Sequence, residues 1–349
     1  MMLTKEADMP DTFSASLRQA CARKGEEKDM SNIRWGVLGT ADIARGQTIP
    51  AMKRAANCDL YAIAGRSLEK AQAFQREFGF AKAYGSYDEL LNDPEVEAVY
   101  IPLPNDLHCE WAKRALNAKK HVLCEKPLAV SKEQEESMFR AAEENGVHLM
   151  EAFAYLHSPI IIAIQKELDA IGEIRYLESA FITPRRPDTD IRLRKETFGG
   201  AMYDLGCYAL SMALWMMGRD PASVRAAAQF SEKHIDLYTT ALLLYENGAV
   251  AKLDCGMLLP NGRLDRLHIY GTKGEIHSPV QFNQCGEIPY TVIRDGKRET
   301  KTVTAANNYQ LEIEQLGRCI RGGETPWVSK AFSLRCAGVM DAILSEIGY

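Results

Sequence analysis

The stretch of the sequence with the clearest chemical potential is a short apolar run that ends abruptly in a carboxylate, an amine and a proline. Residues 121–124 are followed directly by Glu125, Lys126 and Pro127. Proline cannot donate to a sheet ladder, so the run predicts a strand that stops at this point. In an open α/β sheet the carboxyl ends of the strands border the ligand crevice, which makes Lys126 a catalytic candidate. Taken alone, a Glu-Lys pair is more often part of a solvated surface loop.

A glycine-containing turn near the start predicts the phosphate-binding loop of a dinucleotide site. The buried strand expected from residue 33 leads into the hexapeptide Gly39-Thr40-Ala41-Asp42-Ile43-Ala44. This hexapeptide stands where the G-x-G-x-x-G fingerprint lies, with alanine at two of its three small positions. Small residues there let a pyrophosphate and the following helix approach the backbone. The alternative is a strand-to-helix turn that needs only one glycine.

The residues after the second expected strand indicate which dinucleotide binds. The strand 60–64 ends in Gly65, Arg66 and Ser67, and no acidic residue stands there. An acid would accept from the adenosine ribose and repel a 2′-phosphate, whereas an arginine beside a hydroxyl would bind that phosphate. We therefore expect NADP(H) as the cofactor and NAD as less favoured. The alternative is that Arg66 is an ordinary helix-entry residue and Ser67 only caps the helix 68–78.

A stiff, polar loop follows the next strand. The apolar run 96–101 ends in Pro102-Leu103-Pro104, and Asn105 and His108 come directly after it. Because this loop also lies at the carboxyl end of a strand, we expect Pro104 in one wall of the nicotinamide pocket, with Asn105 and His108 as polar contacts. The alternative is that His108 only begins the helix expected over 109–118.

A long apolar helix in the second half carries one carboxylate that needs a partner. Residues 201–217 are apolar on nearly every face, which predicts a buried helix. Asp204 and Tyr208 stand four residues apart, so they share a face of that helix within reach of a common ligand. The alternative is an aspartate that caps the helix start and a tyrosine that only packs.

Length and composition limit the class of protein. The chain has 349 residues, of which 46% are hydrophobic and 26% charged, so it is long enough for two globular domains. A net charge of −5 gives no reason to expect nucleic acid or a membrane as partner. The nine cysteines are scattered, without a CxxC pair or a Cys/His ligand spacing, which indicates reduced thiols in the cytoplasm and no metal site. The expected ligand is a small molecule.

Taken in order, these stretches resemble one known family. Gly39-x-Ala41-x-x-Ala44, Pro104-Asn105-x-x-His108 and Glu125-Lys126-Pro127 look like motifs of the Gfo/Idh/MocA oxidoreductases. Residues 150–153 and 199–208 resemble the branch that contains glucose-fructose oxidoreductase, dimeric dihydrodiol dehydrogenase and NADP-dependent xylose dehydrogenase. The similarity covers about residues 32–349.

The resemblance implies roles for the candidate residues. Tyr208 would be the acid/base, with the Lys126 ammonium lowering its pKa, Asp204 orienting the pair, and Glu125 holding the lysine or the nicotinamide ribose. The family's pattern also places two further residues near the nicotinamide or the substrate, although both are equally typical of a surface: Arg192 and Tyr309.

The sequence departs from the family pattern at two places. Phe198 replaces the first glycine of a triple glycine, and Leu156 stands where these relatives often have an arginine. Either change could reshape a sugar pocket. His157, beside Leu156, is expected to bind substrate rather than to catalyse.

The resulting fold prediction is an α/β protein of two domains. Residues 32–151 are expected to form a dinucleotide-binding Rossmann domain with a doubly wound parallel sheet. Residues 152–349 are expected to form an α+β domain with a large, mostly antiparallel open sheet, which binds substrate and forms oligomers. The last helices can pack back on the first domain. Residues 1–31 are expected to be a flexible extension.

The functional prediction is an NADP(H)-dependent oxidoreductase. It would transfer hydride between nicotinamide and a carbinol or carbonyl carbon of a sugar, polyol or cyclic diol. The alternatives are a redox-assisted lyase or glycosidase with tightly held cofactor, and a non-catalytic NADP-binding regulator. The expected partner is a second copy of the chain, in a homodimer or homotetramer.

Overall fold

A computed structural model describes residues 31–279 and 282–349 of the chain. The chain divides into two units, 1–31 and 32–349, and only the second is described below. The predicted extension over residues 1–31 therefore lies almost wholly outside the described residues.

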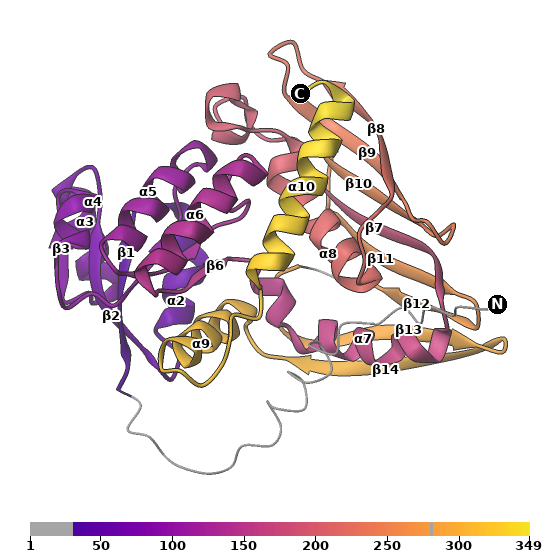
Figure 1. Cartoon of the computed structure of the whole chain (residues 1–349), viewed down its shortest axis with the longest axis horizontal. Coiled ribbons are helices and arrows are strands. Elements are labelled where there is room, and N and C mark those ends of the chain that lie inside the picture. The colour runs from indigo at the N-terminus through magenta and orange to yellow at the C-terminus, as the bar shows by residue number, and fades with distance from the viewer. Residues whose placement is uncertain (1–30, 280–281) are drawn as a thin grey trace, which may run out of the picture. The chain divides into compact units, whose positions relative to one another are not determined.

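The first sheet in this unit is a parallel sheet of six strands in the order β3-β2-β1-β4-β5-β6 (Figure 1). Its strands are β1 Ile33–Leu38, β2 Cys58–Ala64, β3 Lys82–Tyr84, β4 Ala98–Ile101, β5 His121–Cys124 and β6 Leu149–Glu151. The order reverses at β1, so the switch point falls between β1 and β4, where an open α/β sheet binds its ligand. The predicted doubly wound sheet is confirmed.

Helices cover both faces of this sheet, and three of them begin at a serine that caps the first turn. They are η1 Ala44–Thr48, α2 Ile49–Met52, α3 Leu68–Phe78, α4 Tyr87–Leu91, α5 Asn105–Asn117 and α6 Lys132–Asn145. The serines before α3, α4 and α6 each accept a hydrogen bond from a backbone N–H in the first turn. Helix α5 starts at Asn105, one turn before the expected residue 109, because Pro104 is fixed in a conformation suited to the residue that precedes a helix.

The second sheet has eight strands in the order β14-β13-β12-β11-β7-β10-β9-β8, and only β7 and β10 pair in parallel. Its strands are β7 Ile174–Pro184, β8 Ser223–Phe230, β9 Asp236–Leu244, β10 Val250–Leu259, β11 Leu264–Gly271, β12 Gly274–Ser278, β13 Gly286–Arg294 and β14 Lys297–Ala305. The helical segments after β6 are η2 Ala154–His157, α7 Pro159–Ile171, η3 Ile191–Leu193, η4 Lys195–Thr197, η5 Met202–Gly206, α8 Cys207–Met217, α9 Asn308–Ile320 and α10 Lys330–Ile347. Helices α7, α8 and α10 pack against one face of this sheet (Figure 1). The predicted mostly antiparallel sheet is confirmed.

The helix expected over 201–217 differs in its first turn. Residues Met202–Gly206 form a π-helical segment, and the regular helix α8 begins only at Cys207. A π-helical segment disturbs the regular ladder of backbone hydrogen bonds. In this chain the segment contains Asp204.

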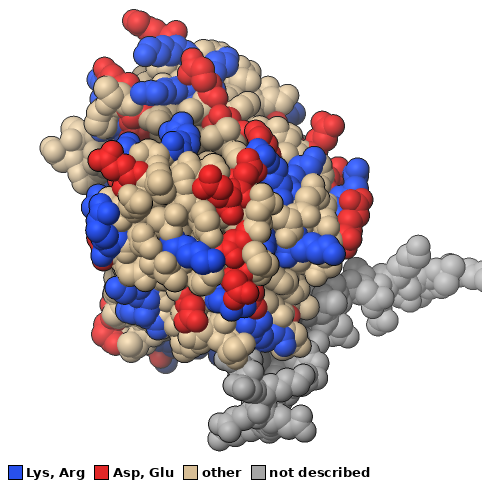
Figure 2. Space-filling model, turned by 90° about the vertical axis from the view of Figure 1, so that its left-hand side faces the viewer, with Lys and Arg blue, Asp and Glu red and all other residues tan. Residues whose placement is uncertain are grey.

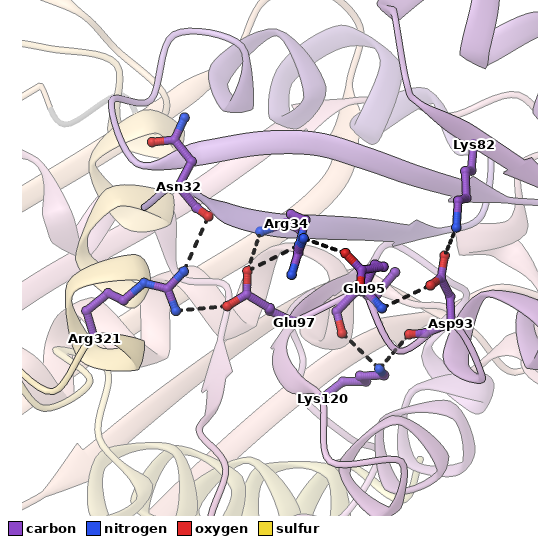
Figure 3. A network of polar contacts seen from close by, with 9 residues as sticks. Asn32, Arg34, Lys82, Asp93, Glu95, Glu97, Lys120 and Arg321 are labelled. Atoms are coloured by element: carbon purple, nitrogen blue, oxygen red, sulfur yellow. Dashed lines mark hydrogen bonds and ion pairs between the residues drawn. The ribbon is translucent and has the colours of Figure 1, made fainter. Parts of the chain in front are cut away.

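The last two helices return to the first sheet. Arg321 follows α9 and forms an ion pair of 2.8 Å with Glu97, just before β4, while its guanidinium also donates to the backbone of Asn32 (Figure 3). At the other end of this network the buried Lys120 donates to the carbonyls of Asp93 and Val96, both at 2.8 Å. The contacts of Arg321 fix the end of α9 at the amino-terminal ends of the strands of the first sheet. The ligand is expected at the opposite, carboxyl ends of these strands.

Two observations concern the membrane-spanning potential and the surface charge of the described residues. No helix among them is long and apolar enough to cross a membrane. On the face shown in Figure 2, at the end of the molecule that carries β3, acidic and basic side chains are interspersed. A face of mixed charge gives no steering toward a polyanion.

Candidate active site

Lys126 lies at the carboxyl end of β5, where a cis peptide bond joins it to Pro127. Its ammonium donates to the backbone carbonyl of Asp204 at 2.8 Å and lies 3.5 Å from the Asp204 carboxylate. The same nitrogen lies 4.6 Å from the centre of the Tyr208 ring. The three residues predicted to catalyse therefore meet, although Lys126 follows the first sheet and the other two belong to the helical segment η5–α8.

The charges of Lys126 and Asp204 stabilise each other. Burial lowers the pKa of Lys126, but Cys207 and Asp204 more than offset this and leave it raised. Because burial raises the pKa of the Cys207 thiol to about 12, that thiol is neutral and Asp204 is the relevant partner. Burial raises the pKa of Asp204, yet Lys126 and Arg192 bring it below its ordinary value. The pair is therefore ionised at neutral pH.

Two arginines complete the surroundings of Asp204. The Arg192 Nε donates to Asp204 Oδ1 at 2.9 Å, and Arg192 also contacts Asp190. The Arg186 Nη2 lies 3.8 Å from Asp204 Oδ2. The contact between Arg192 and Asp204 places Arg192 at the site, whereas nothing in the sequence patterns had pointed to Arg186.

Tyr208 stands in an aromatic wall. Its ring packs against those of Phe153, Tyr155, Phe181 and Phe282, with centroid distances from 5.1 to 6.3 Å. Burial raises the pKa of Tyr208 well above its ordinary value, and Glu125 and Cys207 add to the effect. This differs from the expected lowering by Lys126, because the ammonium lies over the ring rather than beside the hydroxyl. The hydroxyl of Tyr208 therefore keeps its proton at neutral pH.

Glu125 points into a chain of hydrogen bonds that links three elements of the first sheet. Its Oε1 accepts a hydrogen bond from the Tyr100 hydroxyl at 2.5 Å. The Tyr100 hydroxyl oxygen in turn accepts a hydrogen bond from the Thr48 hydroxyl at 2.9 Å. Burial raises the pKa of Glu125, although Lys126 partly opposes this. Tyr309 lies at the start of α9. Burial raises the pKa of Tyr309, and the nearby Tyr208 and Glu125 raise it further. Both predicted residues thus border the catalytic group.

The glycine loop has the close packing that its sequence suggests. Gly39 has φ of +122°, and a Cβ on it would lie 3.1 Å from Leu103. The next four residues of the predicted loop run from the end of β1 to η1: Thr40, Ala41, Asp42 and Ile43. Only glycine is unstrained at that φ, so the turn keeps the backbone open to a ligand.

The two residues expected to read the 2′-phosphate differ in their surroundings. Arg66 is exposed just after β2 and lies near Tyr87, on whose pKa its charge acts. Ser67 accepts from the backbone N–H of Lys70 at 3.4 Å and caps α3. The capping alternative thus holds for Ser67, while the Arg66 guanidinium is open to a ligand.

Asn105 and His108 both bind protein groups. The Asn105 amide donates to the carbonyl of Phe198, in the segment between η4 and η5, at 2.9 Å. The two ring nitrogens of His108 contact the carbonyls of Pro127 and Leu103, at 2.8 and 2.7 Å. His108 therefore joins the loop of Lys126 to the loop that ends at Pro104, instead of presenting a free nitrogen to a cofactor.

His157 lies apart from the catalytic group. Its ring is near Gln315 and Arg318 of α9, and burial lowers its pKa to about 4. Within residues 31–279 and 282–349 no contact joins it to Lys126, Asp204 or Tyr208. A role in substrate binding would require the substrate to reach α9.

Two buried carboxylates that sequence reasoning missed hold the catalytic segments in place. The Asp236 Oδ2 accepts from the backbone N–H of Met202 at 2.8 Å, and a Cβ on Gly200 would clash with its other oxygen. Glu151 accepts from the backbone N–H of Leu128 at 3.0 Å, two residues after Lys126. Asp236 had no signal in the sequence, since an aspartate at a strand start is common, and Glu151 stood only within the stretch 150–153 that resembles the family branch.

The fold and these contacts define a class: two-domain oxidoreductases in which a Rossmann domain is completed by residues from an α+β domain. Residues 33–153 match an oxidoreductase family with an NAD-binding Rossmann fold, and residues 166–277 match the GFO/IDH/MocA C-terminal domain. The chain belongs to the Gfo/Idh/MocA oxidoreductase family. The predicted family, fold class and enzyme class are confirmed.

Several characterised relatives share nearly the whole length. The chain is 34% identical over 316 residues to D-xylose 1-dehydrogenase (NADP(+)) 2 of Haloferax volcanii, covering 88% of this chain and 95% of the relative. It is 31% identical to trans-1,2-dihydrobenzene-1,2-diol dehydrogenase of Xenopus laevis, covering 90% and 98%. The crystal structure of a 3-ketoreductase from Actinomadura kijaniata, in complex with NADP and TDP-benzene, has a TM-score of 0.86 at 33% identity and covers 91% and 98%.

The environment of Asp236 predicts a pH-dependent stability. Burial raises the pKa of Asp236 to about 6, against about 3.9 in an unfolded chain. The folded state then binds the proton more tightly, so the free energy of unfolding falls as pH rises from about 4 through 6, by about 2–3 kcal/mol from this group. Asp236→Asn keeps an oxygen acceptor for Met202 and cannot ionise, so the variant should gain stability relative to wild type across that window in urea denaturation.

The exposed Asp188 provides the control, because Asp188→Asn should leave the pH dependence unchanged. A stability difference between Asp236→Asn and wild type that stays constant with pH would contradict the assignment.

Proposed function

We propose that the protein is an NADP(H)-dependent oxidoreductase that moves hydride between nicotinamide and a carbinol or carbonyl carbon of a sugar, polyol or cyclic diol. The single observation that carries this proposal is the contact of Lys126 with Asp204 and the Tyr208 ring at the carboxyl end of β5. The names of the relatives support it, because they include an NADP(+)-dependent xylose dehydrogenase, a diol dehydrogenase and a ketoreductase solved with NADP.

The residues present fit a dinucleotide. A side chain at Gly39 would meet Leu103, and the backbone from Gly39 to Ile43 is left open to a pyrophosphate. Arg66 would hold the 2′-phosphate, and Glu125, Arg192 and Tyr309 would border the nicotinamide end. When bound, the cofactor supplies the hydride carrier. We assign residues 32–151 to cofactor binding and 152–349 to substrate binding.

The chain's own residues would then handle the substrate oxygen and its proton. The protonated Tyr208 hydroxyl donates to a carbonyl oxygen during reduction, and it accepts the hydroxyl proton during oxidation after losing its own. The Lys126 ammonium stabilises negative charge on that oxygen, and Asp204 holds the ammonium in place. Solved variants of the Actinomadura ketoreductase change one lysine and one tyrosine, which is consistent with such a pair.

The Tyr208 hydroxyl is the first group to test. Tyr208→Phe keeps the ring and its packing, so turnover with NADP should fall by about two to four orders of magnitude while NADP affinity stays nearly unchanged. Lys126→Met should also lower turnover, and the double variant should lose less than the sum of both effects, because the groups act as one unit. Steady-state rates and cofactor titrations measure both quantities.

Tyr238→Phe is the matched control, because this hydroxyl bonds Asp254 on the second sheet. If Tyr208→Phe keeps near-normal turnover across the pH range, the tyrosine only packs. Cofactor that co-purifies and resists exchange, with no net NADPH formed, would instead favour a redox-assisted lyase or glycosidase.

Arg66 is expected to set the preference for NADP. A charge-assisted pair with the 2′-phosphate is worth about 1.5–3 kcal/mol, so Arg66→Ala should weaken NADP by roughly 10- to 100-fold and leave NAD almost unchanged. Isothermal titration with both dinucleotides measures this. Arg76→Ala, at the far end of α3, is the control for lost positive charge. Equal weakening of both dinucleotides would contradict the assignment.

We further propose that two copies pair through the free face of the eight-stranded sheet. On that face rings stack without being fully buried, with His268 and His277 at 4.3 Å and Tyr176 and Tyr270 at 5.8 Å. Light scattering at micromolar concentration should give at least a dimer, and Tyr270→Lys should shift it toward the monomer, whereas Lys53→Glu should not. A wild-type monomer would refute the pairing.

The eight cysteines described are all free thiols, which supports the cytoplasm as the working compartment.

A further inference from the structure

The loop between β7 and η5 brings more positive charge to the site than Asp204 can pair at close range. Arg192 Nε, Lys126 Nζ and Arg186 Nη2 lie 2.9, 3.5 and 3.8 Å from its carboxylate oxygens. Arg192 has a second carboxylate, Asp190, and Lys126 also donates to a carbonyl. Arg186 has only the long contact among the residues that the structure describes, so it is the least satisfied cation of the three.

The hydrogen-bonding state of Arg186 supports this view. Its Nε is buried and makes no hydrogen bond within the described residues, and the same holds for the Asp204 Oδ2 that it faces. A buried N–H without an acceptor is unfavourable. The side chain as a whole is 34% exposed, so a ligand can reach the guanidinium from solvent.

A second guanidinium stands on the adjoining loop. The backbone N–H of Arg185 donates to the carbonyl of Leu259 at 3.2 Å, which ties the loop after β7 to the end of β10. Beyond that end, Arg263 lies 4.3 Å from the centre of the Phe181 ring. Phe181 in turn packs against Tyr208 with 5.4 Å between ring centres. Arg186 and Arg263 thus belong to two joined loops, but Arg263 pairs with Asp265 at 2.7 Å, whereas the carboxylate that faces Arg186 lies 3.8 Å away.

Resting on the function proposed above, we propose that the substrate carries an anionic group, a carboxylate or a phosphate, that Arg186 binds while its reacting carbon faces Lys126 and Tyr208. A planar guanidinium with free N–H groups matches both anions in geometry and charge. The substrates would then be sugar acids or phosphorylated sugars rather than neutral sugars.

Binding can be tested without turnover. Protein saturated with NADPH would be mixed with methyl α-D-glucoside, its glucuronide, or α-D-glucose 1-phosphate, none of which has a carbonyl to reduce. We expect a larger rise in Tm with the glucuronide or the phosphate than with the neutral glucoside, and loss of that excess in Arg186→Gln. The two anionic arms distinguish a carboxylate from a phosphate, and saturation with NADPH keeps the cofactor's own phosphate sites filled.

The matched control is Arg185→Gln, because this neighbour is 74% exposed and pairs only with Asp188 among the described residues. It should keep the excess shift. Equal shifts for charged and neutral sugars, or an excess that survives in Arg186→Gln, would overturn the proposal and leave Arg186 as a partner of Asp204 only.

Rates with NADP⁺ separate this inference from the proposed function. With D-glucuronate, D-glucose 6-phosphate and D-glucose, which keep a free anomeric hydroxyl, the ratio of kcat/KM for the better anionic sugar over the neutral one should be roughly 10- to 100-fold in wild type and should collapse in Arg186→Gln. A ratio near one with measurable oxidation would reject the anionic substrate and keep the oxidoreductase. Anion-specific binding with no oxidation of any sugar would keep the anionic ligand and reject the oxidoreductase.

Discussion

The active site depends on one contact, the bond from the Lys126 ammonium to the backbone and side chain of Asp204. These residues are joined by 2.8 and 3.5 Å contacts. In a regular α-helix each carbonyl accepts from the N–H four residues on, but Asp204 lies in the π-helical segment Met202–Gly206, where that ladder is disturbed. Its carbonyl accepts from Lys126, which follows a strand of the other sheet. The irregular turn therefore coincides with the acceptor that holds the Lys126 amine.

The supports of this contact come from both sides. On the Rossmann side, His108 and Glu151 each bond the backbone that follows Lys126, through Pro127 and Leu128. On the other side, Asp236 caps the backbone N–H of Met202 at the start of the π-helical segment. Each support is buried, and each bonds a backbone group rather than the catalytic side chain. These bonds act on the backbone that carries Lys126 and Asp204.

Much of the fold and the centre of the site could be predicted because they depend on local sequence. The strand that ends at Glu125-Lys126-Pro127 and the glycine turn at Gly39 follow from residue type and position alone, and the resemblance to a family supplied Tyr208 and Arg192. The supports could not be predicted in this way. Asp236 lies 34 residues from Met202, and Glu151 lies 23 residues from Leu128, so only the fold brings these partners together. The expected lowering of the Tyr208 pKa by Lys126 was wrong. The sequence does not reveal whether the Lys126 amine faces the ring of Tyr208, as it does in the structure, or its hydroxyl.

Burial separates the residues that we assign to the chemistry from the arginines on the loop after β7. The side chains of Lys126 and Asp204 are 12% and 13% exposed, whereas those of Arg186 and Arg192 are 34% and 40% exposed. A buried ion pair is rigid and weakly screened, which suits a group that must hold charge on a reacting oxygen. An arginine on a surface loop is easily replaced without disturbing the core, because loops tolerate change better than the elements they connect. The same strand ends can therefore serve different sugars through changes in the loop after β7, and the specificity of this chain is best sought in the arginines of that loop.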